Sequence, residues 1–119
     1  MRSGMNEIPA DAVRDLDGLK SRMQALFALD ELTFMDTGSH GIMFGVAGTP
    51  RARCLALQEI TGPEHWSEGD GVAWTYRNDQ ENVLIMLSRG GRGLTLVTAT
   101  VVDLHLRYLQ QFSGALGAE

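Results

Sequence analysis

The stretch NVLIMLS, residues 82–88, restricts the possible folds more than any other part of the sequence. The residues from Val83 to Leu87 are all large and apolar, so a strand here places apolar side chains on both of its sides. Such strands are typical of the centre of a sheet that is covered on both faces. The alternation of Val72, Trp74 and Tyr76 before it predicts a second strand, and residues 94–99 predict a third. The glycine-rich RGGRG between the last two reads as a hairpin turn.

Two amphipathic segments flank the strands. A helix is predicted to begin near Pro9 to Asp11, and a second is predicted over 101–115. Their apolar residues recur at helical spacing: Val13, Leu16, Met23, Leu26 and Phe27 in the first, and Val102, Leu106, Leu109, Phe112 and Leu116 in the second. Residues 1–8 read as a flexible lead-in, and 9–119 as a single domain, as the length of 119 residues suits.

The segments between the first helix and residue 72 are less regular. Leu32 and Phe34, then Ile42, Phe44 and Val46, alternate as two strands of a hairpin. Residues 51–60 are ambiguous: Leu55 and Leu57 alternate as in a strand, whereas the Ala and Leu content favours a helix. We prefer the strand. Residues 61–71 read as a long polar loop with at most one helical turn.

The predicted fold class is α+β: a single antiparallel sheet of five or six strands in a meander, with the N-terminal and C-terminal helices packed on one face. The other face still carries apolar residues, and no further predicted element covers it. We therefore expect a second copy of the chain or another protein to cover it.

Composition excludes several classes of function. The net charge is −5, Lys20 is the only lysine and the arginines are scattered, so the clustered positive charge that nucleic acids require is missing. No run of eighteen apolar residues predicts a membrane span, and no signal peptide is visible, so we expect a cytoplasmic protein. With one cysteine and no phosphate loop or dinucleotide motif, we expect no cofactor.

The sequence Asp36-Thr37-Gly38 matches the active-site loop of aspartic proteases, and it resembles the single copy of a retropepsin-like half-enzyme. In that family two such aspartates share one proton across a dimer axis. The resemblance implies that Asp36 is the catalytic aspartate, but it covers only residues 34–39. An amphipathic helix precedes the motif here, where that family has a β-hairpin. A hairpin turn is the alternative, because Asp, Gly, Ser and His are ordinary turn residues.

Other chemistry-bearing residues are few. His40, His65 and His105 show no metal-binding spacing, so we expect no metal site. Cys54 lies among Leu and Ala, which suits a small core residue, although a neighbouring histidine would make it a candidate nucleophile. An enzyme or ligand-binding site would therefore combine Asp36, His40 and Cys54.

The loop 61–71 contains the predicted partner-binding residues Glu64, His65, Trp66 and Glu68. A loop tryptophan ringed by polar groups is typical of a binding hot spot, whereas a tryptophan folded over the sheet would belong to the core. The leading hypothesis is a non-enzymatic, homodimeric adaptor, chaperone or regulatory subunit that binds another protein. Its order of helix, meander and helix is distantly similar to that of roadblock-type dimeric regulators and class I secretion chaperones.

Overall fold

A computed structural model describes residues 12–27, 35–36, 40–69 and 73–117. It contains one six-stranded antiparallel sheet and three helices, which confirms the predicted α+β class. The elements are α1 (Leu16–Phe27), β1 (Met35–Asp36), β2 (Gly41–Ala47), α2 (Pro50–Thr61), β3 (Trp66–Gly69), β4 (Ala73–Asn78), β5 (Val83–Arg89), β6 (Leu94–Val101) and α3 (Val102–Gly117). The predicted lead-in 1–8 and strand residues Leu32 and Phe34 lie outside the described residues.

The strand order is β1-β2-β6-β5-β4-β3. Strands β3 to β6 form the predicted meander, and the β1–β2 hairpin joins the sheet beside β6 rather than beside β3. The residues that connect β2 to β3 form α2, which crosses over the sheet. The expected hairpin around residues 34–42 is present, because Met35 pairs with Met43 and Asp36 pairs with Ile42.

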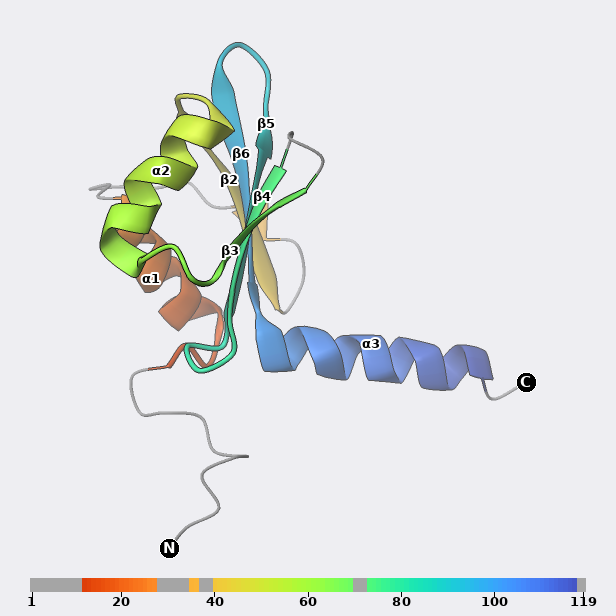
Figure 1. Cartoon of the computed structure of the whole chain (residues 1–119). Helices are drawn as coiled ribbons and strands as arrows, with labels where there is room; N and C mark the ends of the chain where they lie inside the picture. Colours follow the sequence, from red (N-terminus) through yellow and green to blue (C-terminus); the bar gives the residue numbers. More distant parts are fainter. Residues whose placement is uncertain (1–11, 28–34, 37–39, 70–72, 118–119) are drawn as a thin grey trace, which may run out of the picture.

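The core lies between the sheet and the helices α1 and α2, which cover the same face (Figure 1). Alternate residues of β5 and β6 point into it and are fully buried: Val83, Ile85, Leu87, Val97, Ala99 and Val101. From the helices, Leu19 and Met23 of α1 and Cys54 and Leu57 of α2 meet them. This apolar burial supplies most of the driving force for folding.

The strand preferred for residues 51–60 is wrong, because these residues lie in α2. Thr49 caps the helix by accepting a hydrogen bond from the Ala52 N–H, and Pro50 occupies the first turn, where its missing N–H costs nothing. Leu57 is buried, whereas Leu55 remains 54% exposed. The alternation had indicated that the two leucines share one face of a strand, and the structure shows that they do not.

The long loop predicted for residues 61–71 is also wrong in part. Residues 66–69 form β3, the edge strand that pairs with β4, in the register Trp66 with Tyr76 and Glu68 with Trp74. Four residues are too few for a readable alternation, which is why the strand escaped prediction.

The C-terminal helix α3 is present but lies away from the other two. Figure 1 shows it leaving the end of β6 and pointing away from the sheet, on the side opposite α1 and α2. The second helix that covers the core face is therefore α2, in the place expected for the C-terminal helix. Within the described residues, no helix is both long and apolar enough to cross a membrane.

Asn82, in the turn between β4 and β5, holds the start of α3. Its side-chain oxygen accepts from the Asp103 N–H at 2.9 Å, and its side-chain nitrogen donates to Asp103 Oδ1 at 2.8 Å and to the Val13 carbonyl at 2.9 Å. The residue is 3% exposed and has a φ of 68°, a left-handed conformation that Asn tolerates better than most residues. One side chain thus joins the segment before α1, the β4–β5 turn and the first turn of α3.

Replacing Asn82 by Ala is expected to lower the free energy of unfolding by about 2–4 kcal/mol, because one buried and two partly buried hydrogen bonds are lost and a Cβ residue remains in a left-handed conformation. Asn82→Gly loses the same bonds without that strain and is expected to cost about 1 kcal/mol less. Urea unfolding at one fixed protein concentration measures both. Gln80→Ala, at an exposed position of the same turn, is the control and should change stability by less than about 0.5 kcal/mol. Equal midpoints for Asn82→Ala and wild type would contradict this role.

Candidate functional site

Helices α1 and α2 cover one face of the sheet and leave the opposite face uncovered (Figure 1). We call it the open face. In register across the sheet it carries Met43, Thr98, Met86 and Thr75, flanked by Leu84, Leu94 and Leu96. Met86 is 42% exposed and Leu94 is 44% exposed, whereas their buried neighbours on the other face are fully enclosed. The open face is therefore the second apolar side that the sequence predicts for 82–88.

A second apolar surface lies on α3. Leu106, Tyr108 and Leu109 are each at least 42% exposed, although α3 is markedly amphipathic. Polar residues lie next to them, since Asp103 and Arg107 of the same helix form an ion pair of 3.1 Å. Clusters of exposed apolar side chains rimmed by polar residues mark interaction surfaces.

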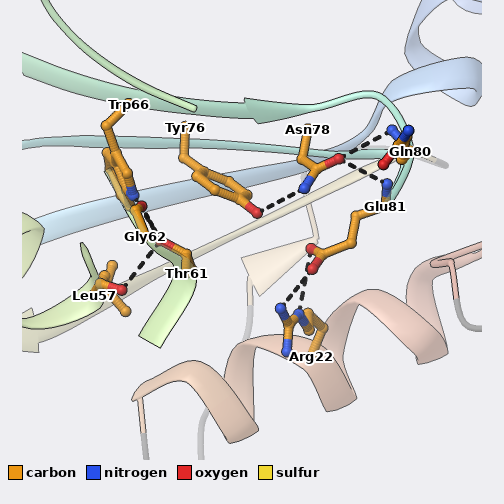
Figure 2. A network of polar contacts seen from close by, with 9 residues as sticks. All are labelled: Arg22, Leu57, Thr61, Gly62, Trp66, Tyr76, Asn78, Gln80 and Glu81. Carbon is orange, nitrogen blue, oxygen red and sulfur yellow. Dashed lines mark hydrogen bonds and ion pairs between the residues drawn. The ribbon is translucent and has the colours of Figure 1, made fainter. Parts of the chain in front are cut away.

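Trp66 folds back toward the core side of the sheet. Figure 2 shows its indole beside Thr61, to whose Oγ1 the Nε1–H donates at 3.0 Å. The ring centroids of Trp66 and Tyr76 are 5.2 Å apart. Thr61 in turn donates to the Leu57 carbonyl, which ties the indole to the end of α2. The indole is half-buried and packs against the core, so it has a structural role, whereas the predicted role in partner binding stays a prediction.

The other predicted partner-binding residues divide between two cavities. Glu64, His65 and Trp66 line a shallow, open cavity of about 530 Å³ beside the turn that connects β4 and β5. Glu68 lines a separate cavity of about 340 Å³, together with Arg51, Cys54, Leu55, Gln58 and Trp74. Glu64, His65 and Glu68 are exposed. The structure thus groups three of the four residues around one cavity and places Glu68 farther along the same strand, in the second cavity.

Strand β3 lies at the edge of the sheet, so part of its backbone faces away from β4. The Arg77 N–H donates to the His65 carbonyl at 3.1 Å. The backbone N–H and C=O groups of odd-numbered residues in β3 therefore face β4, and those of even-numbered residues face away from it. The N–H and C=O of Glu68 therefore face away from the sheet. An exposed sheet edge of this kind is able to add a strand from another chain.

The alternative site residues contact different elements. His40 precedes β2 and packs against α3: its ring centroid lies 5.0 Å from that of His105 and 4.9 Å from that of Tyr108. Cys54 lies on α2 against the core and accepts a hydrogen bond from Gln58 at 3.3 Å. Asp36 is in β1, and its side chain lies outside the described residues.

Two histidines come together in a way that sequence spacing did not reveal. The Nδ1 atoms of His40 and His105 are buried and have no hydrogen-bond partner. Burial, and then the proximity of His105, lower the pKa of His40 below its ordinary value. His65 lies elsewhere, edge-on to Tyr76. Over the described residues, no group of three or more His, Cys, Asp and Glu side chains is arranged to hold a metal ion.

Burial raises the pKa of the Cys54 thiol, the Gln58 hydrogen bond opposes this, and the nearby Glu68 adds to it. A nucleophilic cysteine requires the opposite shift, because the thiolate is the reactive form. The geometry therefore suits a core thiol better than a catalytic one.

The RGGRG segment forms the β5–β6 turn, with Arg92 and Gly93 at positive φ. It lies beside Thr49 and Pro50 at the start of α2 and lines a cavity of about 380 Å³.

Comparison of the chain with protein-family models, with curated proteins and with solved structures gives no match.

We expect Cys54 to react with a disulfide reagent much more slowly in the folded protein than in urea, because the thiol is 1% exposed and held protonated. The raised pKa also predicts a pH effect on stability. Above the unfolded-state pKa of Cys, near 8.5, only the unfolded chain releases the proton, so the free energy of unfolding falls as pH rises. Cys54→Ala should reduce that loss of stability.

In the labelling experiment, rapid reaction of the native protein with the disulfide reagent at neutral pH would instead favour a reactive cysteine.

Trp66→Ala is expected to lower the free energy of unfolding by about 2 kcal/mol, since a half-buried ring leaves its contacts with Tyr76. Trp66→Phe keeps much of the packing but loses the donor to Thr61, and should cost about 1 kcal/mol. Ser67→Ala, at the exposed neighbouring position, is the matched control. Thermal and urea unfolding report the three variants. A wild-type midpoint for Trp66→Ala would mean that the indole contributes nothing to the fold.

Proposed function

We propose that the protein is a non-enzymatic interaction module that acts as a homodimer and binds another protein as an adaptor, chaperone or regulatory subunit. The observation that carries the proposal is the open face, where Met86 and Leu94 are more than 40% exposed in the middle and at the end of a six-stranded sheet. Apolar surface of this extent is costly to leave in water. A second copy of the same chain is able to cover this face, and two-fold dimers are the commonest oligomers.

The partner-binding surface in this proposal is the β3 edge with Glu64, His65, Trp66 and Glu68. Three features support it: the outward backbone groups of Glu68, the cavity of about 530 Å³ beside Trp66, and two exposed carboxylates. An extended segment with basic side chains matches both the strand edge and the charge. The proposed compartment is the cytoplasm, where the free thiol of Cys54 stays reduced.

A catalytic function receives less support. His40 packs against α3 and Cys54 packs between α2 and the sheet, and burial raises the pKa of the thiol. A nucleophile and a base must lie within hydrogen-bond reach of each other. The interaction module therefore accounts for more of the described surface than an enzyme built on Asp36, His40 and Cys54.

Light scattering at micromolar concentration is expected to give about twice the 13.0 kDa of one chain. Met86→Glu places a charge in the middle of the open face and should shift the protein toward monomer, because an unpaired charge is costly to bury. Ile60→Glu is the matched control: Ile60 is 60% exposed but lies on α2, on the other side of the sheet. Circular dichroism checks that both variants fold. A wild-type protein that stays monomeric over a wide concentration range would refute the homodimer.

A further inference from the structure

The open face and the apolar side of α3 are complementary surfaces that a single chain does not bring together. The first is a flat apolar sheet without a helix, and the second is a helix without a sheet. Figure 1 shows α3 pointing away from the sheet on the side of the open face, so that it stands clear of the strands. Leu106 and Leu109 of the helix remain 45% and 42% exposed, and Met86 of the sheet remains 42% exposed.

The direction of α3 is set at its root. Asn82 holds the Val102 and Asp103 N–H groups, the Val101 N–H donates to the His40 carbonyl, and the His40 ring stacks on Tyr108 at 4.9 Å. These contacts hold the first two turns of α3 to the end of β6 and to the residue before β2. Folding the helix back over its own sheet would break the buried bonds of Asn82, which is 3% exposed.

The dimensions of the two surfaces agree. With 16 residues, α3 is about 24 Å long. The seven residues of β5 and the eight of β6 extend over about 23–27 Å. The helix and the two central strands are therefore of similar length.

We propose that two copies exchange their C-terminal helices, so that α3 of each copy lies along β5 and β6 on the open face of the other. This inference rests on the proposed homodimer and specifies how it forms. The contact occurs twice, related by a two-fold axis, because each copy supplies one helix and one sheet. The exchange buries Leu106 and Leu109 of one copy against Leu84, Met86 and Leu96 of the other.

The charge distribution agrees with this arrangement. On α3 the charges of Asp103 and Arg107 are paired with each other at 3.1 Å. The sequence places Phe112 and Leu116 at the helical spacing of Leu109, which extends the apolar pattern toward the end of the helix. On the open face, Thr75, Thr98 and Thr100 are neutral, and Arg77 is paired with Asp79 at 2.8 Å. No unpaired charge among these residues needs to be buried.

The area approaches what a specific dimer requires. A helix about 24 Å long and about 10 Å wide has a footprint of about 240 Å² on a sheet. Two such contacts, counted on both surfaces, bury about 960 Å², close to the roughly 1,000 Å² expected of a specific interface. The interdigitation of Met and Leu side chains raises the true value above this planar figure.

Site-specific cross-linking between two distinguishable full-length chains tests the exchange. One chain carries Met86→Cys, the other is isotopically labelled and carries Leu109→Cys, and both carry Cys54→Ala to remove the native thiol. The chains are unfolded together, refolded as a mixture and treated with a short bismaleimide, and the products are read by mass spectrometry. The expected product is mainly the covalent pair of one labelled and one unlabelled chain, whereas each variant alone gives little cross-linked dimer.

Each other outcome overturns the proposal in a distinct way. Cross-linking of Met86→Cys alone means that two open faces pack together, and cross-linking of Leu109→Cys alone means that two α3 helices pair. A chain with both cysteines that cross-links within itself as a monomer means that α3 folds back. A dimer by light scattering without any of these products places the interface elsewhere. A monomer refutes the proposed homodimer itself. If Met86→Cys fails to fold by circular dichroism, Thr98→Cys, its neighbour in register on β6, replaces it.

Discussion

The hydrogen bonds of one buried amide, Asn82, determine how the parts of this fold are joined. The side chain binds Val13 before α1 and Asp103 at the start of α3, while its own backbone takes the left-handed conformation that turns β4 into β5. A buried amide that is fully paired adds little net free energy, but leaving its partners unpaired is expensive. The main effect of these hydrogen bonds is therefore to fix the direction of α3, and their contribution to the total stability is secondary.

That direction divides the molecule into two unlike sides. On one side α1 and α2 complete a conventional core with Tyr76, Ile85 and Leu87 fully buried. On the other side the same strands present Leu84, Met86 and Leu96, and α3 stands clear of them. The methionines suit a surface that packs against another chain, because the unbranched thioether adapts to a partner's shape. In a monomer the open face and the apolar side of α3 both stay exposed to water, which is the physical basis for proposing that a second chain is present.

The fold class could be predicted from the sequence because residues 82–88 are apolar on both sides of a strand, which indicates an interior strand in any register. Sequence reasoning missed α2, although Thr49 followed by Pro50 is a helix-start signal, because the alternation of Leu55 and Leu57 was given more weight. The position of α3 was beyond its reach, since it depends on a contact between residues 82 and 103 that no local pattern encodes. The meeting of His40, His105 and Tyr108 escaped it for the same reason. Trp66 was identified as notable, but its bond to Thr61 depends on how α2 ends.

The pairing of β2 with β6 has a consequence for biosynthesis. Gly41 lies opposite Thr100 and Ala47 lies opposite Leu94, so β2 finds its neighbour only among the last residues of the sheet to leave the ribosome. The β3–β6 meander forms from local contacts, whereas docking of β2 closes a far longer loop and is expected to come late. Until then the nascent chain exposes Ile42, Phe44 and Val46, which are buried in the finished protein. A newly made chain therefore exposes the apolar side of β2 until β6 has been synthesised, and exposed strands of this kind are prone to aggregation.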